Sequence, residues 1–213
     1  NESARNLENG IYPTISANGL VKNNVSYGAL DTAMWVAASE NVRVLDNEMH
    51  SSVIGLEISV SNEVFVSYNR IHNNTLGVGL FHPNAAGNLP LPVMANWVVE
   101  NNKIFSNNLP NIAPPGSFQA SLPSGVGVML LGVSQNVIAN NQVKGNDFVG
   151  IGVLGWCTAT GLTPGRDCRA DPPRGDPSAN DNLVYGNWVI GNGANPPSGG
   201  LDFLASDITF FQL

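Results

Sequence analysis

Residues 101–108, "NNKIFSNN", enclose a short apolar pair between two pairs of asparagines. Asparagine is a poor former of both helices and strands, so its placement here needs a structural reason. It tolerates left-handed backbone dihedrals better than other residues except glycine, which suits it to sharp corners. The chain has 29 asparagines and only 12% charged residues, so uncharged amides supply much of its polar surface.

An Asn-x-apolar triplet recurs along the chain. Its members are Asn23-Asn24-Val25, Asn47-Glu48-Met49, Asn69-Arg70-Ile71, Asn102-Lys103-Ile104, Asn141-Gln142-Val143 and Asn187-Trp188-Val189. The spacings are 24, 22, 33, 39 and 46 residues, which indicates a basal period of about 22 with inserted loops. A small or polar residue follows each triplet Asn after five positions: Gly28, Ser52, Asn74, Asn107, Asn146 and Asn192.

Each period holds three short segments of alternating polarity, such as "MWV", "VRV" and "EMH". Such alternation predicts strands, and helical spacing of apolar residues is missing. Three strands per period predict an all-β fold, a right-handed parallel β-helix of about six to seven coils stacked roughly 4.8 Å apart. Stacked asparagines would then bond to one another in a ladder at the corners. We expect one β-helix domain over residues 1–213, preceded by further sequence because residues 6–10 already read as part of a coil.

Three insertions interrupt the repeat, at residues 82–95, 109–124 and 157–181. The first and third follow the first strand of their coils and the second precedes one, so we expect them to wall the first-strand sheet. The outward row predicted on that sheet is Trp35, Glu57, Gly79, Gly127, Gly152 and Asp202. A flat glycine floor beside an indole and a carboxylate suits an extended sugar chain, with Trp35, Gly79, Gly127 and His82 as substrate-binding residues. Alternatively, the small residues let the loops fold down over the sheet.

A second constellation lies on the predicted third strands. The triplet alignment stacks Glu48, Arg70 and Lys103 in one column and His50, His72 and Phe105 in the next. Such groups can support acid-base chemistry, so Glu57, His72, Arg70 and His50 are the candidate catalytic residues. The alternative is a solvated face. A metal site at His50 and His72 would have Glu48 as its only evident third ligand, so we predict none.

Cys157 and Cys168 enclose a Gly- and Pro-rich loop. A disulfide between them would indicate an oxidising compartment; two free thiols are the alternative. The same loop carries Asp167, Asp171, Asp176 and Asp181, which could hold Ca²⁺ or form an ordinary solvated loop. No other cofactor is predicted.

Composition argues against two classes of partner. The net charge is -7 and only nine Lys and Arg are spread along the chain, which disfavours nucleic acid. No apolar run reaches the roughly 18 residues that a membrane helix needs. The sequence also lacks a G-x-S-x-G turn, an H-E-x-x-H helix and a phosphate-binding glycine loop.

The segments "GIYPTISANGLVKNN", "VIGLEISVSNEVFVSYNRIHNNTLGVGL", "NNKIFSNNLPNIAPPGS" and "SGVGVMLLG" resemble a family of secreted bacterial parallel β-helix repeat proteins. The resemblance covers roughly residues 10–155 and assigns no catalytic residues. The wider group of β-helix proteins that the chain resembles includes pectate lyases, alginate lyases and uronan epimerases. The lyases use a cluster of Asp residues, and this sequence places no such cluster on one strand face.

Two functions are therefore predicted. The first is a secreted protein that binds or modifies a polysaccharide at the loop-walled face, with lyase, epimerase or glycosidase-like activity. The alternative is a non-enzymatic scaffold or a surface protein that associates with itself through an uncapped end of the solenoid.

Overall fold

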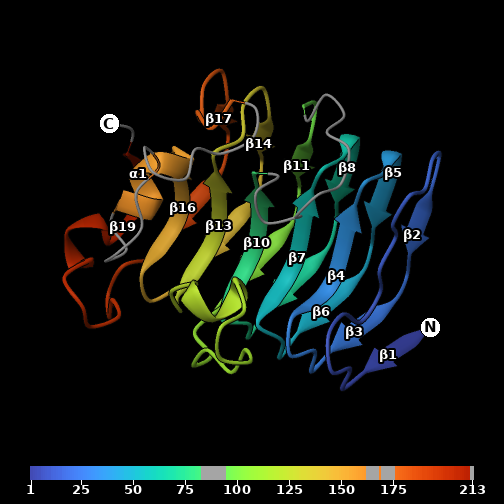
Figure 1. Cartoon of the computed structure of the whole chain (residues 1–213), viewed down its shortest axis with the longest axis horizontal. Helices are drawn as coiled ribbons and strands as arrows, with labels where there is room; N and C mark the ends of the chain where they lie inside the picture. Colours follow the sequence, from blue (N-terminus) through green and yellow to red (C-terminus); the bar gives the residue numbers. More distant parts are fainter. Residues whose placement is uncertain (83–94, 162–167, 169–175, 212–213) are drawn as a thin grey trace.

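A computed structural model describes residues 1–82, 95–161, 168 and 176–211. Its strands form three parallel sheets, A, B and C, and successive turns of the chain add one strand to each sheet (Figure 1). Sheet A contains β1 (Glu2–Ala4), β3 (Val25–Tyr27), β6 (Glu48–His50), β9 (Arg70–His72), β12 (Lys103–Phe105), β15 (Gln142–Lys144) and β18 (Trp188–Ile190). Sheet B contains β4 (Thr32–Ala37), β7 (Ile54–Ser59), β10 (Leu76–Phe81), β13 (Val126–Leu131), β16 (Val149–Leu154) and β19 (Ser206–Phe211). Sheet C contains β2 (Leu20–Lys22), β5 (Glu40–Leu45), β8 (Asn62–Ser67), β11 (Val98–Glu100), β14 (Val137–Ala139) and β17 (Leu183–Tyr185).

Helical structure in the described ranges is short. It comprises α1 (Trp156–Gly161) and the 3₁₀ turns η2 (Gln119–Ser121) and η3 (Asp202–Leu204). None of these helices has the length and apolar character needed to cross a membrane.

The strands of each sheet stack in the order of the coils, so the predicted parallel β-helix is confirmed. Among the described residues, sheet A has seven strands and sheets B and C have six each, which matches the expected six to seven coils. In chain order, residues 82–95 come after β10, residues 109–124 come before β13, and residues 157–181 come after β16; residues 83–94, 162–167 and 169–175 lie outside the described residues.

The inward residues of the three sheets fill the bore of the solenoid. On sheet B they form a column in which Met34, Leu56, Val78, Val128 and Ile151 are each fully buried. Trp97 is the largest fully buried side chain, and its indole N–H donates to the Ser61 carbonyl at 2.9 Å. The bore is therefore a packed apolar core whose one buried indole N–H has a partner.

An asparagine ladder runs along the corner that precedes sheet A. The side-chain nitrogen of Asn47 donates to Asn69 Oδ1 at 3.1 Å, and Asn69 donates in the same way to Asn102 at 2.9 Å. Asn102 then donates to Asn141 at 3.0 Å although 39 residues separate the two. The insertions between coils thus leave the ladder unbroken, and the predicted stacking of these residues is confirmed.

The ladder corrects two details of the sequence-based alignment. Asn24, and not Asn23, bonds to Asn47, so the first triplet was aligned one residue early. Five residues on, the N–H of Ala29 rather than of Gly28 donates to Ser52 Oγ. Residues 23 and 24 are both asparagine, so the sequence alone does not show which of them begins the triplet.

At each corner, one residue adopts the left-handed backbone conformation and the next residue makes the ladder hydrogen bonds. The sequence suggested that a single asparagine did both. The residue before each ladder Asn takes the left-handed conformation, as Asn23, Asp46, Tyr68, Asn101 and Asn140 do with φ between 53° and 60°. The ladder residue itself turns its amide toward backbone carbonyls. Asn69, for example, donates to the carbonyls of Val44 and Ser67. Such bonds satisfy buried backbone groups that the sharp corner removes from the sheets.

Candidate functional site

The outer face of sheet B carries the row of outward-facing residues that was predicted to form a trough. Two members of this row differ from the prediction. Strand pairing gives the row as Trp35, Glu57, Gly79, Met129, Gly152 and Thr209. Met129 takes the place predicted for Gly127, and Asp202 lies in η3 instead of a strand. The letters "GVG" occur at residues 77–79 in β10 and at residues 125–127 at the start of β13, and aligning them shifts the register by two residues.

Gly127 therefore has a packing role. It aligns with Gly77 of the previous coil, and a Cβ atom on Gly127 would lie 2.5 Å from the carbonyl oxygen of Gly150 in the next coil. Only glycine allows the coils to approach this closely at that position. Gly127 is therefore not a member of the outward row in which the sequence-based prediction placed it.

The half of the outer face toward the C-terminus is covered by apolar side chains. The ring of Phe81 lies over Gly79, and Phe118 packs edge-on against Phe81 with ring centroids 5.3 Å apart. Trp156 stacks on Phe118 at 6.0 Å. Here the alternative interpretation, loops folded down over the sheet, is confirmed, and the flat glycine floor does not form.

His82 lies in the same covered region. It is fully buried, and its ring centroid is 5.5 Å from that of Trp156. His82 is therefore not exposed in an open trough, as the sequence-based prediction required, because it is fully buried beside Trp156 of α1.

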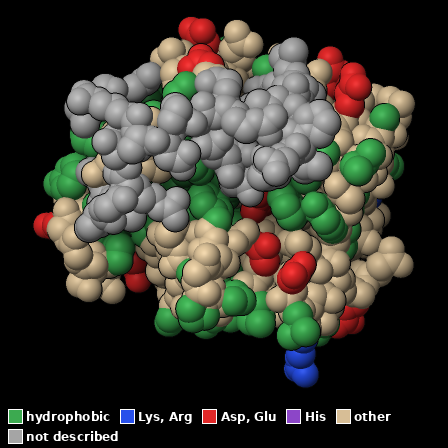
Figure 2. Space-filling view, in the orientation of Figure 1, with side chains coloured by type: hydrophobic (Ala, Val, Ile, Leu, Met, Phe, Trp, Pro, Cys, Tyr) green, Lys and Arg blue, Asp and Glu red, His purple; other side chains and the backbone are tan. Residues whose placement is uncertain are grey.

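The half of the face toward the N-terminus is polar and holds what we call the carboxyl site, made of Asp31, Thr32 and Glu57. Thr32 Oγ1 lies 2.9 Å from Asp31 Oδ1 and 3.3 Å from Glu57 Oε2. Glu57 is only 1% exposed and Thr32 is fully buried, whereas Asp31 is half-buried. One hydroxyl thus joins a buried carboxyl group to a more accessible one. Figure 2 shows acidic side chains gathered on this face beside apolar ones.

Burial raises the pKa of Glu57 to about 8, and the charge of Asp31 adds to the rise. Hydrogen bonds from Thr32 and Ser59 oppose it without cancelling it. The pKa of Asp31 is also raised, first by burial and further by Glu8, while bonds from Thr32 and Gln119 oppose the rise. Glu57 is therefore mostly protonated at neutral pH. Its O–H can donate to Thr32, whose own hydroxyl then donates to Asp31.

Two aromatic rings border the carboxyl site. Tyr12 and Trp35 stack with centroids 4.6 Å apart and an interplanar angle of 10°. The indole N–H of Trp35 donates to Ser59 Oγ at 2.8 Å. Tyr12 therefore covers one face of Trp35, and the exposed ring is that of Tyr12, whose residue is 41% exposed.

Tyr12, Asp31 and Thr32 were not predicted from the sequence. One signal could have found Tyr12, because it precedes Trp35 by 23 residues, one coil period. Asp31 and Thr32 show no comparable signal, since their role depends on the hydroxyl contact to Glu57 in the next coil.

Sheet A carries the second predicted constellation, and strand pairing confirms both of its columns. His72 Nε2 lies 2.9 Å from Glu48 Oε1, and Arg70 Nε lies 3.5 Å from the same oxygen. The rings of Tyr27, His50, His72 and Phe105 form one continuous stack with centroids between 4.8 and 5.3 Å apart.

The charges of this face influence one another. Hydrogen bonding to His72 is the main cause that lowers the pKa of Glu48. Burial and the neighbouring His72 lower the pKa of His50, while Glu48 partly offsets this. Glu48 and His50 are partly exposed, so the ion pairs on sheet A resemble those of an ordinary solvent-exposed surface.

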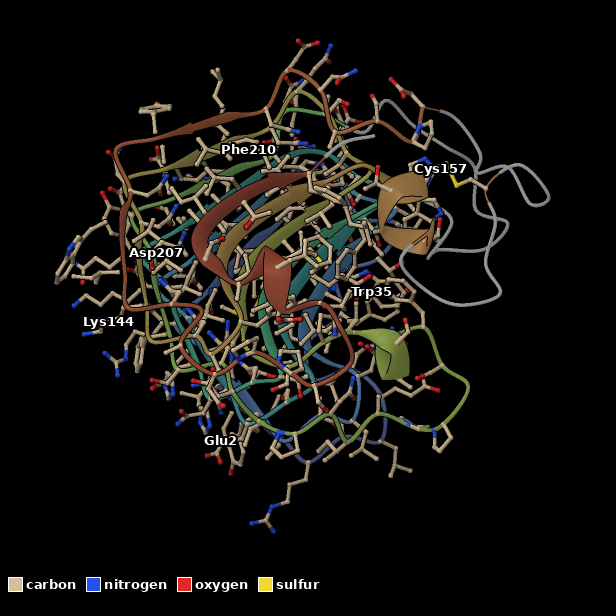
Figure 3. The ribbon with its side chains drawn as sticks, turned by 90° about the vertical axis from the view of Figure 1, so that its left-hand side faces the viewer. Glu2, Trp35, Lys144, Cys157, Asp207 and Phe210 are labelled. Carbon is tan, nitrogen blue, oxygen red and sulfur yellow. A yellow bond between two sulfur atoms is a disulfide. The ribbon has the colours of Figure 1, made fainter. Side chains whose placement is uncertain are left out.

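The four candidate catalytic residues do not form one site. Glu57 faces outward from sheet B, whereas His50, Arg70 and His72 face outward from sheet A. Figure 3 shows the sheet A residues Glu2 and Lys144 on the side away from Trp35 of sheet B. The bore separates the two faces, because a three-sided coil directs the outward side chains of different sheets in different directions.

The disulfide between Cys157 and Cys168 is confirmed; it ties α1 to the segment that follows it. Asp167 and Asp171 of the proposed calcium loop lie outside the described residues. Asp176 accepts a hydrogen bond from the backbone N–H of Ser178 at 2.9 Å, which lowers the pKa of its carboxyl group. Within the described part of the chain, no group of three or more His, Cys, Asp or Glu is arranged to hold a metal ion.

The fold and its two outer faces define a solenoid protein in which loops cover one of three sheets. The chain belongs to the right-handed β-helix family: the family model described as "Right handed beta helix region" matches residues 1–163. Comparison with curated proteins and with solved structures gives no match. The family establishes the fold and its handedness and assigns no activity to the carboxyl site.

Proposed function

We propose that this β-helix protein is secreted, binds an uncharged polysaccharide at the carboxyl site, and uses the Asp31–Glu57 pair to protonate a glycosidic oxygen. The observation that carries the proposal is the buried carboxyl group of Glu57, whose pKa is raised and which the Thr32 hydroxyl links to Asp31. A carboxylic acid that keeps its proton near neutral pH is what acid-catalysed cleavage of a glycosidic bond requires. The disulfide supports secretion, because such bonds persist in oxidising compartments.

Burial assigns the roles within the pair. Asp31 is the more accessible group, so a bound sugar contacts Asp31, and Glu57 replenishes its proton through Thr32. Asp31 gives a proton to the leaving oxygen as the C–O bond breaks. Water then adds to the anomeric carbon, and the proton that it loses passes through Asp31 and Thr32 back to Glu57. The exposed ring of Tyr12 is an apolar surface on which a sugar can rest.

Charge favours a neutral substrate over a uronate. A uronic acid would bring a further carboxylate against Asp31 and Glu57, and Glu8 already acts on Asp31 from nearby. Like charges at this distance repel and raise each other's pKa. Of the three activities predicted from the sequence, a glycosidase-like one therefore fits the carboxyl site better than a lyase or an epimerase.

The proposal is tested by calorimetric binding to neutral glucans, mannans and xylans beside pectate and alginate, with release of reducing ends measured in parallel. We expect at least one neutral polysaccharide to bind and both uronans to bind more weakly. Asp31→Asn and Glu57→Gln should each reduce release of reducing ends at least a hundredfold, and Glu57→Gln should retain binding. Glu40→Gln, an exposed position on sheet C, is the matched control and should behave as the wild type.

Preference for a uronan, or equal product release by wild type and Glu57→Gln, would contradict the assignment. Binding without any product would retain the glycan site and refute the proton-transfer role.

Self-association is a second candidate function, which the two ends of the solenoid favour. The N-terminal end opens into a cavity of about 440 Å³ bordered by Ser3, Ile11 and Val21. At the other end Trp188, Ile190 and Phe210 are each at least 50% exposed. Exposed apolar residues such as these suit stacking of copies of the chain.

Sedimentation across a range of protein concentrations tests this second function. Ile190→Lys should abolish any growth in mass with concentration, whereas Ile112→Lys should not. The two isoleucines are 50% and 51% exposed, so they differ in location and not in exposure. A wild-type protein that stays monomeric at all concentrations would exclude this function.

A further inference from the structure

A second cavity lies on the outer face of sheet B, at the opposite end from the carboxyl site. Its volume is about 120 Å³, and we call it the Trp156 pocket. Met129, Leu131 and Leu154 of β13 and β16 line it, as do Trp156 and Ala159 of α1. Leu122 and Leu204 are among the further lining residues. Segments from three separate parts of the chain therefore enclose one apolar space.

The walls of this pocket are less tightly packed than the bore. Met129 is 8% exposed and Leu154 is 7% exposed, whereas their neighbours on the inner face, Val128 and Ile151, are fully buried. An apolar void of this kind loses contact energy until something fills it.

The size and chemistry of the pocket point to one class of ligand. An apolar cavity of about 150 Å³ lined by Leu, Ile and Phe stays dry and binds benzene. The Trp156 pocket is slightly smaller and opens at one side, so a single aromatic ring is the largest rigid group that it accommodates.

Two hydroxyl groups border the pocket, and both have already donated their hydrogen. Ser121 Oγ donates to the Phe118 carbonyl at 2.7 Å, and Thr160 Oγ1 donates to the Trp156 carbonyl at 3.0 Å. Each oxygen can still accept a hydrogen bond. No Lys or Arg is among the described residues that line the pocket, so a carboxylate on the ligand would be buried without a counter-charge.

We propose that the Trp156 pocket is a binding site for a small uncharged aromatic molecule, a single ring that carries no more than one hydroxyl group. The site is separate from the carboxyl site, and the inference does not depend on the proposed function. The disulfide at Cys157 supports it, because a tether on α1 holds that wall in place over the sheet without filling the space.

Toluene, p-cresol and benzoate are the probes for the test, observed through the methyl groups of ¹³C-labelled methionine. We expect toluene and p-cresol to shift the Met129 methyl resonance in a saturable way. Met34 and Met49, which are fully buried in the bore, are internal controls and should not move. Benzoate should bind at least tenfold more weakly than p-cresol, because its charge has no partner in the pocket.

Variants complete the experiment. Ala159→Phe places a ring in the pocket from the half-buried face of α1 and should weaken binding of toluene at least tenfold. Ala120→Phe makes the same change at an exposed position in the neighbouring η2 and should leave binding unchanged. The proposal is overturned if neither neutral probe shifts Met129 in the wild type, if Met34 and Met49 shift equally, or if benzoate binds as tightly as p-cresol.

Discussion

The repeated and the unrepeated parts of this molecule differ in packing and in chemistry. The bore and its ladders repeat the same contacts in each coil, and their apolar residues are almost all fully buried. The covering of sheet B has no repeat: a carboxyl pair occupies one end and an apolar cluster with a cavity occupies the other. Stability is therefore concentrated in the part that the repeat specifies, and candidate binding chemistry in the part that it leaves free.

The largest expected effect is the loss of one ladder amide. Asn102→Ala removes the partners of the Asn69 N–H and of the Val66 and Glu100 carbonyls, all close to the core. At roughly 1–3 kcal/mol for each buried unsatisfied group, the free energy of unfolding should fall by about 4 kcal/mol. Chemical denaturation measures this, and Asn195→Ala at an exposed position should change it by less than about 0.5 kcal/mol. Similar losses for the two variants would show that the ladder is not a main source of stability.

The next largest expected effect is a dependence of stability on pH that arises from Glu57 on the outer face of sheet B. Because the pKa of Glu57 is raised from 4.5 to about 8, the folded protein retains a proton that the unfolded chain releases. Stability should therefore be highest below pH 4.5 for this group and should fall as pH rises toward 8, by about 1.4 kcal/mol per pH unit at most. Glu57→Gln cannot ionise, so it should be the more stable form at pH 9, by a few kcal/mol on this arithmetic.

Thermal unfolding of both proteins between pH 5 and 9 provides the measurement. Glu40→Gln should keep the wild-type slope. If Glu57→Gln and the wild type have parallel pH profiles, then Glu57 is not a buried protonated group.

A smaller effect is expected from the disulfide. Removing both cysteines by Cys157→Ser and Cys168→Ser frees a loop whose ends are 11 residues apart. The loop-entropy argument limits the loss to about 3 kcal/mol, and the cost should fall mainly on α1 and the Trp156 pocket. Hydrogen exchange should show faster exchange in α1 while the strands of sheet A are unchanged. Uniformly faster exchange would mean that the covering and the coil unfold as one unit.

The smallest effect is expected on sheet A. Glu48→Gln breaks the contacts to Arg70 and His72, whose side chains are 52% and 13% exposed. Exposed ion pairs contribute under about 1 kcal/mol, so stability should hardly change. Because Glu48 raises the pKa of His50, its loss should lower that pKa further, which an NMR titration can follow. An unfolding free energy reduced as strongly as by Asn102→Ala would place sheet A among the main stabilising elements.

The sequence predicted the repeated part well because its signals are local. Spacing and alternation are visible without any knowledge of long-range contacts, and they predicted the three sheets, the column of Glu48 and Arg70, and the ladder of Asn47, Asn69 and Asn102. The covering of sheet B was predicted poorly. Whether Gly127 or Met129 faces outward depends on a shift of two residues that no periodicity reveals. The link from Asp31 through Thr32 to Glu57 depends on contacts between coils that no motif records.

The ladders are directional. In each one the amide of an earlier coil donates to the oxygen of the next, so the side-chain dipoles all point the same way and polarise one another along the axis. A second ladder runs through Asn74, Asn107, Asn146 and Asn192. Its last amide, that of Asn192, donates to Asp207, which is labelled in Figure 3. A carboxylate accepts hydrogen bonds but cannot donate one, so the series of donated bonds stops at Asp207. Its negative charge lies beside the positive N–H end of the aligned amide dipoles.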